Sequence, residues 1–387
     1  MQLSRREMVG MLAAIGGQHI SGTVPAIALA KSNATYERNK DRTDIPYDGK
    51  SPNRLVCDTT LRELPDGSWI LFMLAGGETE PSADNFIGVT RSLDLGKTWT
   101  TLKIVDVGLP RAGETKAQGP TELVVIGERC TLFFSTHSLE DWSHNWQSWV
   151  THSDDMCRTW SQPELLPGRL ATRTFIRNHL VTKDGRILLP FQHYVGPESE
   201  VSKVPIDRAL TNPRNGVLIS DDRGKTWKEY GNIRLTRDDR YFGWAENNIV
   251  ELPDNRVGMI IRADKLGGVL YYAESTDGGL SWPDFAEKST IPNPGSKATL
   301  YPLGRHAVGL LHNPNSSHRS PLSLWISFDG MKTWPYQRVL VSESSDGPSG
   351  RLNYPDGFVS RDKRWLHFAY DDNRHRAVYY GARLPRV

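Results

Sequence analysis

Short apolar or alternating runs occur in pairs along this chain, and a polar turn joins the two members of each pair. The first pair, "TTLRELPDGSWILFML", turns through Pro-Asp-Gly, and later pairs turn through Lys-Asp-Gly or Pro-Asp-Asn. Runs of this length around such turns predict β-hairpins. The chain has six of these pairs, at residues 59–74, 121–136, 179–192, 248–262, 298–312 and 356–370.

A second motif recurs out of phase with the hairpins. It is an octapeptide of the form S-x-D-x-G-x-(S/T)-W, from which Cys157 and Met331 depart at the Gly position. Asp can bond backbone amides within the turn, Gly allows a positive φ, and Trp can pack between neighbouring sheets. The octapeptide is therefore predicted to build structure. Its five copies are Ser92–Trp99, Ser153–Trp160, Ser220–Trp227, Ser275–Trp282 and Ser327–Trp334.

Six hairpins and five octapeptides, repeating about every sixty residues, predict an all-β fold with one four-stranded sheet per repeat. The simplest architecture is a six-bladed β-propeller spanning residues 31–387. Its sixth blade lacks the octapeptide and is expected to be closed by a strand from the N-terminal segment.

The first thirty residues do not fit this repeat. Arg5 and Arg6 precede a weakly apolar run, and Ala28-Leu29-Ala30 has the small-x-small pattern that a signal peptidase cuts. The segment 1–30 resembles a twin-arginine export signal, so the mature chain is expected to be exported, periplasmic or extracellular. No other apolar run approaches the length of a membrane span.

Charge and cysteine content exclude several function classes. The chain has 47 basic and 45 acidic residues, without the basic excess expected of a nucleic-acid binder. Its three cysteines are too few and too scattered for a disulfide scaffold or a zinc site, so no metal is expected. No Gly-rich nucleotide fingerprint is present, and no cofactor is expected.

The innermost strand of every propeller blade lines a central channel, so equivalent positions that differ in polar character indicate a site. Ionisable residues stand near the starts of five of the six predicted inner strands, the second being preceded by Gly119-Pro120, and histidines accumulate around the hairpins. The first set comprises Asp58, Arg177, Glu246, Lys297 and Tyr354, and the second His137, His179, His193 and His312.

Three segments resemble the sialidase superfamily, in its bacterial branch with Asp-box (BNR) repeats. They are "AENNIVELPDNRVGMIIR", "HRSPLSLWISFDGMKTW" and "NYPDGF". The resemblance implies that Tyr354 is a nucleophile activated by Glu246. It also implies that Arg262 and Arg319 bind a substrate carboxylate, and that Asp84 is the general acid and base.

Two features depart from the family pattern. The early F-R-I-P segment is replaced by "SPNRLVCDTTL", and the "GGETEP" loop lacks an arginine. Arg54 is then a candidate for the third carboxylate-binding arginine, and Arg177 is an alternative from another blade.

The implied residues make chemical sense together. A sialic acid carries a carboxylate on its anomeric carbon, which would repel a carboxylate nucleophile, whereas a neutral Tyr deprotonated by Glu avoids that repulsion. Arginines stay charged and bind carboxylates bidentately. The leading hypothesis is therefore an exo-glycosidase that removes a terminal acidic sugar, by default sialic acid, from a glycan with retention of configuration.

Two other function classes remain open from the sequence. A polysaccharide lyase acting on uronates would use Tyr354, or a histidine such as His193, to abstract the proton beside an arginine-bound carboxylate. A non-catalytic glycan-binding propeller would leave Glu246 beyond hydrogen-bonding reach of the Tyr354 hydroxyl.

Overall fold

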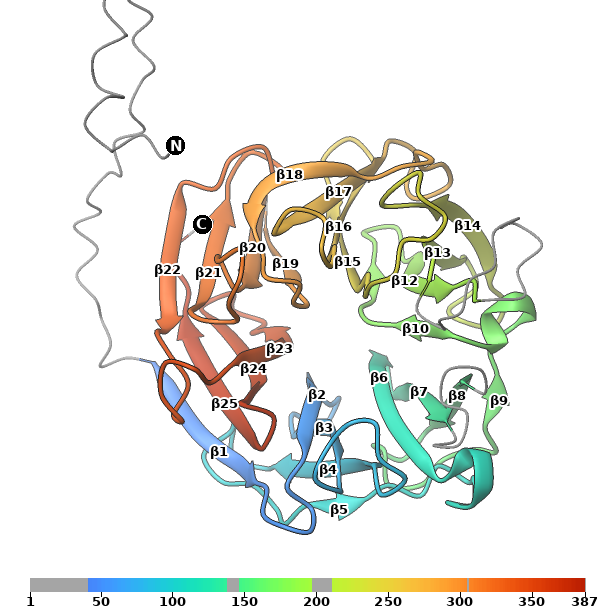
Figure 1. The fold of residues 1–387 in the computed structure, drawn as a ribbon, viewed down its shortest axis with the longest axis vertical. Coiled ribbons are helices and arrows are strands. Elements are labelled where there is room, and N and C mark those ends of the chain that lie inside the picture. The colour runs from blue at the N-terminus through green and yellow to red at the C-terminus, as the bar shows by residue number, and fades with distance from the viewer. Residues whose placement is uncertain (1–40, 138–145, 197–210, 305, 387) are drawn as a thin grey trace, which may run out of the picture. The chain divides into compact units, whose positions relative to one another are not determined.

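A computed structural model describes residues 41–137, 146–196, 211–304 and 306–386 of the chain. The described residues form six antiparallel sheets around a common centre, with β2, β6, β10, β15, β19 and β23 nearest to it (Figure 1). The predicted six-bladed, all-β propeller is confirmed. The segment 1–30 lies outside the described residues. Within the described part of the chain, no helix is long and apolar enough to cross a membrane.

The blades follow one another in chain order, each running from the centre outward. Blades I and II consist of β2 (Val56–Glu63), β3 (Trp69–Ala75), β4 (Phe86–Ser92) and β5 (Lys103–Ile104), and then β6 (Ala117–Ile126), β7 (Arg129–His137), β8 (Gln147–Ser153) and β9 (Glu164–Leu165). Blade III has β10 (Thr174–Ile176), β11 (Leu180–Val181), β12 (Ile187–Tyr194), β13 (Pro213–Ser220) and β14 (Lys228–Ile233). Two short 3-10 helices, Gly113–Thr115 and Gly168–Ala171, lie in connections.

The remaining blades repeat the same order. Blade IV has β15 (Asn247–Leu252), β16 (Arg256–Ile261), β17 (Val269–Ser275) and β18 (Glu287–Pro292), and blade V has β19 (Thr299–Gly304), β20 (Ala307–His312), β21 (Leu322–Ser327) and β22 (Tyr336–Val341). Blade VI has β23 (Leu352–Val359), β24 (Trp365–Asp372) and β25 (Arg376–Arg383). Its outermost strand is β1 (Arg42–Asp48), which pairs antiparallel with β25. As predicted, an N-terminal strand closes the blade that lacks the octapeptide.

The octapeptide folds as its residue types predict. In the copy at Ser220–Trp227, Asp222 accepts hydrogen bonds from the amides of Lys225 and Thr226 and from the hydroxyls of Ser220 and Thr226, at 2.6 to 3.0 Å. The Gly position has a left-handed backbone in every copy, including those with Cys157 (φ 59°) and Met331 (φ 72°). The motif therefore tolerates non-glycine residues there, because its hydrogen bonds hold the turn.

The hydrophobic core is divided among the six contacts between neighbouring blades. Each adjacent pair of blades shares one cluster of buried apolar side chains. The octapeptide Trp adds to the contact with the preceding blade, as when Trp160 of blade II meets Phe72 of blade I at 6.2 Å between ring centroids. These Trp rings, among them Trp227, are half-buried rather than fully buried.

One inner strand departs from the regular pattern. The innermost position of blade III is shared by β10 and β11, which both pair with β12 and leave residues 177–179 between them. Arg177, Asn178 and His179 therefore do not pair within the sheet. Instead, Arg177 forms an ion pair with Asp58 of blade I, and His179 bonds Glu122 of blade II. The break frees two ionisable side chains for the channel.

Candidate active site

The side chain of Tyr354 lies at the start of the inner strand of blade VI, in a polar cluster. Its hydroxyl donates a hydrogen bond to Oε1 of Glu246 over 3.0 Å and accepts one from Nη1 of Arg262 over 2.9 Å. A bulge in β23 between Asn353 and Asp356 gives Tyr354 a left-handed backbone, with φ 50°. Bulges re-aim side chains next to functional sites, and this one directs the ring out of the strand's regular alternation.

Glu246 is buried and ionised. It directly precedes β15 and is 3% exposed. Burial opposes its ionisation, but the charges of Arg262, Arg177 and Arg319 outweigh that cost and hold the pKa of Glu246 below its usual value. Burial and then the Glu246 charge raise the pKa of Tyr354 well above its usual value. The pair is therefore a neutral tyrosine beside a carboxylate that can accept its proton.

Arg262 fixes this pair in place. Its Nη1 reaches both oxygens of Glu246, at 3.1 and 3.0 Å, while Nε and Nη2 bind the two oxygens of Asp264 at 2.7 and 2.9 Å. Asp264 was not singled out from the sequence, although it stands two residues after Arg262. All three guanidinium nitrogens of Arg262 are therefore hydrogen-bonded within the protein, so Arg262 positions Tyr354 and Glu246.

Arg319 approaches from the connection between β20 and β21. Its guanidinium lies 5.5 Å from the centroid of the Tyr354 ring, and it donates to Oδ1 of Asn353 over 2.9 Å and to the carbonyl of Gly295 over 2.7 Å. A cavity of about 330 Å³ beside these groups is lined by Arg262 and Arg319, and by Lys265, His318 and Arg351. The four arginine and lysine side chains of this lining outnumber its one carboxylate, that of Asp264, which suits an anionic ligand.

Arg177 completes a group of three arginines near Glu246. It is 4% exposed, and its Nη1 lies 2.9 Å from Oδ2 of Asp58. Among the described residues, its Nε has no hydrogen-bond partner. An unsatisfied buried donor is unusual and indicates a place for a ligand group or water.

Two further predicted site residues, Arg54 and Asp84, stay predictions, because their exposure and contacts do not test the roles given to them. Arg54 is exposed between β1 and β2, and Asp84 is exposed on the loop between β3 and β4. The contacts of the Asp84 backbone run to Ser82 and Arg111. In the part of the chain that the structure describes, no contact joins either residue to Tyr354 or Glu246, so the structure brings together Tyr354, Glu246, Arg262, Arg319 and Arg177.

The histidines considered for elimination chemistry make no contact with Tyr354 or Glu246 among the described residues, and the ring nitrogens of His137 and His312 have no hydrogen-bond partner there. His193 bonds the hydroxyl of Thr174, His312 packs edge-on against Trp325, and His179 bonds Glu122. Burial lowers the pKa of His193 to about 3 and that of His312 to about 3.

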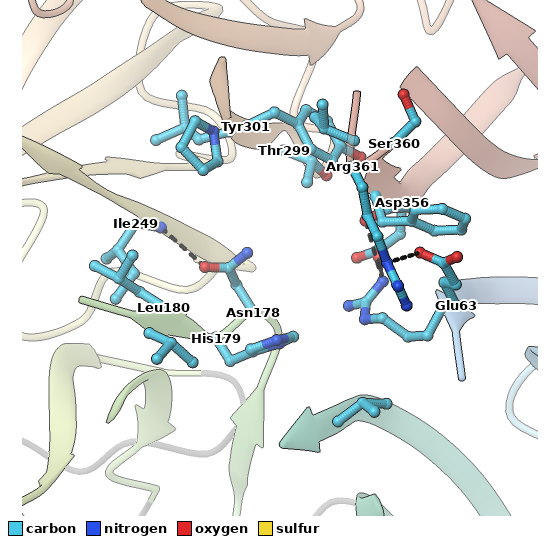
Figure 2. Close-up of a pocket in the computed structure, with 18 of the residues that line it drawn as sticks. Glu63, Asn178, His179, Leu180, Ile249, Thr299, Tyr301, Asp356, Ser360 and Arg361 are labelled. Carbon is cyan, nitrogen blue, oxygen red and sulfur yellow. Dashed lines mark hydrogen bonds and ion pairs between the residues drawn. The ribbon is translucent and has the colours of Figure 1, made fainter. Parts of the chain in front are cut away.

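A second group of buried charged side chains connects the inner strands of different blades. Arg62 forms ion pairs with Glu122 and Asp356, and Lys297 reaches Asp356 at 2.6 Å. Toward the other ends of the inner strands lies a second cavity, of about 500 Å³ (Figure 2). There Asp356 and Arg361 stand opposite Asn178 and His179, and Oδ1 of Asn178 accepts the amide of Ile249. Because Arg62 and Lys297 already neutralise these carboxylates, the network joins four blades without a ligand.

One further set of residues offers ligand atoms close together. Atoms of Cys57, Asp58 and Glu80 lie within 4.8 Å of one another. We assign no metal to this set, because Arg177 pairs with Asp58 and Arg374 pairs with Glu80 at 2.5 Å. All three cysteines of the chain are free and buried.

The sequence was compared with protein families and with known proteins, and the two comparisons agree. Residues 67–367 match the family model described as BNR repeat-like domain. The chain is 26% identical to a sialidase from Micromonospora viridifaciens over 92% of its own length, and it spans only 57% of that relative.

Two solved structures share the fold. A protein of unknown function from Dyadobacter fermentans has a TM-score of 0.67 at 18% identity, covering 89% of this chain and 99% of its own. A Hadza microbial sialidase has a TM-score of 0.65 at 20% identity, covering 85% of this chain and 66% of its own.

Proposed function

The chain belongs to the BNR repeat-like family of the sialidase superfamily, and on that premise we propose that it is a retaining exo-glycosidase that hydrolyses a terminal acidic sugar, sialic acid by default, from glycans. The observation that carries this proposal is the hydrogen bond of 3.0 Å between the Tyr354 hydroxyl and the Glu246 carboxylate. A purely binding propeller has no need for a buried base beside a neutral phenol.

The proposed reaction begins with the substrate carboxylate among the arginines. Arg177, whose Nε has no hydrogen-bond partner among the described residues, offers a charged N–H group to it, and Arg319 lies beside the Tyr354 ring and lines the neighbouring cavity. As the Tyr354 oxygen attacks the anomeric carbon, its proton passes to Glu246, so no anion approaches the substrate carboxylate before bond formation. An acid protonates the departing oxygen, and the same group then activates the water that releases the sugar.

Sialic acid is the default substrate for two reasons. It places a carboxylate directly on the reacting carbon, which fits arginines clustered around a tyrosine nucleophile. In addition, two relatives of similar sequence or fold are named sialidases. The relevant partner is therefore a sialylated glycan or glycoconjugate.

The experiment compares the protein with its Tyr354→Phe variant on sialylated glycans and, separately, on uronate-rich polysaccharides. Free sialic acid released by the wild type and not by the variant supports the proposal. An unsaturated uronate product instead identifies a lyase, and no product on either panel favours pure binding.

We also propose that the chain is exported through its twin-arginine-type segment. Replacing Arg5 and Arg6 with Lys is expected to retain the protein in the cytoplasm, measured by cell fractionation. Unchanged export of that variant contradicts the proposal.

A further inference from the structure

Asp58 occupies on blade I the position that Tyr354 occupies on blade VI. Both sit in a bulge near the start of an inner strand, and both have a left-handed backbone, with φ 51° for Asp58 and 50° for Tyr354. The hydroxyl of Thr59 donates to the carbonyl of Tyr354 over 3.2 Å and ties the two bulges together. Because Tyr354 is the proposed nucleophile, Asp58, held beside it by this bond, is a candidate for a direct role.

The carboxylate of Asp58 lies among charged groups from several elements. Arg177 pairs with it from the break between β10 and β11, and the side chain of Asp58 is 12% exposed. Glu80 faces it from the loop between β3 and β4, Lys297 from the segment before β19, and Tyr354 from β23. Cys57 neighbours it on its own strand.

The carboxylates of Asp58 and Glu80 lie close together, and each has its own counter-ion. Glu80 pairs with Arg374 at 2.5 Å and accepts the thiol of Cys57 over 3.4 Å. Burial raises the pKa of Asp58, Arg177 lowers it, and the charge of Glu80 raises it again, leaving it above its usual value. Asp58 therefore depends on Arg177 to remain ionised.

A substrate carboxylate would compete for the same arginine. Arg177 is buried, and its Nε has no hydrogen-bond partner in the described ranges of the chain, so a carboxylate on the substrate gains a partner there. Asp84, by contrast, is exposed and has its backbone contacts on its own loop and with Arg111.

We propose that Asp58 is the general acid and base of this site, and that it takes up a proton when the substrate carboxylate replaces it as the partner of Arg177. This inference rests on the proposed function and names the residue that moves the proton. The total charge around Arg177 stays the same, because the substrate carboxylate replaces that of Asp58. Asp58 is then neutralised by a proton from solvent.

The protons balance over the whole cycle. In the first half, Asp58 gives its proton to the glycosidic oxygen as that bond breaks, while the Tyr354 oxygen bonds the anomeric carbon and its proton goes to Glu246. In the second half, Asp58 takes a proton from the attacking water, the bond to Tyr354 breaks, and Glu246 returns its proton to the tyrosine. The net reaction is hydrolysis, with no other reactant.

The test compares a substrate whose leaving group must be protonated with one whose leaving group departs without a proton. Wild type, Asp58→Asn and Asp84→Asn are compared on sialyllactose and on 4-methylumbelliferyl N-acetylneuraminide, whose phenolic leaving group departs readily unprotonated. Asn tolerates the left-handed backbone that Asp58 has, and thermal melting checks the fold. Asp154→Asn, whose side chain is 78% exposed, is the matched control.

We expect Asp58→Asn to lower kcat on sialyllactose by about 10² to 10⁴-fold, the usual contribution of acid–base catalysis, and to lower it less than tenfold on the aryl substrate. The acidic and basic limbs of its pH profile should also change. An equal loss on both substrates overturns the proposal, as does a leaving-group-dependent loss in Asp84→Asn instead. A wild type inactive on both sialosides removes the proposed function, and the inference falls with it.

Proton uptake gives a second readout that a merely structural role would not move. Calorimetric binding of N-acetylneuraminic acid at pH 7, in buffers of different ionisation enthalpy, should show about one proton taken up by the wild type and none by Asp58→Asn. Equal uptake by the two proteins contradicts the exchange at Arg177.

Discussion

Tyr354 of blade VI donates a hydrogen bond to Glu246, which directly precedes β15 of blade IV and stands 108 residues earlier in the chain. Blade V lies between them in the sequence of blades, so the pair exists only because the propeller closes. Arg262 binds both partners at once and holds the phenol against the carboxylate. This triangle of a phenol, a carboxylate and a guanidinium underlies the first two predictions.

Tyr354→Phe and Glu246→Gln are each expected to lower kcat by about 10³-fold or more, because they remove the nucleophile and its base. The Tyr354 side chain does not build the apolar contacts between blades, so the melting temperature of Tyr354→Phe should change little. Steady-state kinetics with sialyllactose measure the effect. A Tyr354→Phe variant that keeps a tenth of the wild-type kcat contradicts the assignment.

Arg262→Ala and Arg319→Ala should differ in a way that separates positioning from binding. Removing Arg262 leaves the buried Glu246 without its nearest counter-ion, which costs about 3–5 kcal/mol of unfolding free energy as well as activity. Removing Arg319 loses two hydrogen bonds to Asn353 and Gly295 and should raise KM and lower kcat, with a stability loss of about 1–2 kcal/mol. Denaturant unfolding and kinetics together measure the contrast, and equal destabilisation by the two substitutions contradicts it.

Trp227→Ala should reduce stability without abolishing turnover. The ring packs against the contact between blades II and III and is half-buried, so we expect a loss of about 2 kcal/mol, below the range for a fully buried Trp. Denaturant unfolding measures this loss, and kinetics at a temperature well below the transition check the activity. An inactive variant with unchanged stability contradicts the structural role of the octapeptide.

Asp371 makes stability depend on pH. Burial raises its pKa to about 7, while Asn353 donates to its Oδ1 over 2.6 Å. Its pKa is higher in the folded state, so the folded state binds more protons between about pH 4 and pH 7, and stability falls as pH rises through that window, by an amount on the order of 4 kcal/mol. Asp371→Asn removes this titration and keeps an acceptor for Asn353.

The variant should therefore melt above the wild type at pH 8 and at nearly the same temperature at pH 4. Scanning calorimetry at the two pH values makes the comparison. A stability difference independent of pH would contradict the assigned pKa direction.

The repeat and the local structure of each copy follow from residues that are close together in the sequence. Hairpin turns and the Ser-Asp-Gly-Trp octapeptide act through contacts within about eight residues, as Asp222 shows with its bonds to the amides of Lys225 and Thr226. Six such units predict a ring, because each unit covers its apolar faces only by packing on its neighbours. The resemblance to known segments also singled out Tyr354, Glu246, Arg262 and Arg319.

Which ionisable groups meet depends instead on the packing of the blades around the ring. Arg177 reaches Asp58 because the inner strand of blade III is interrupted after Ile176, and no residue pattern marks that break. Arg54, the other candidate from the sequence, stays exposed instead. Side chains at the starts of different blades converge through the closure of the ring, which depends on every contact between blades at once, whereas the repeats depend on residues close in sequence.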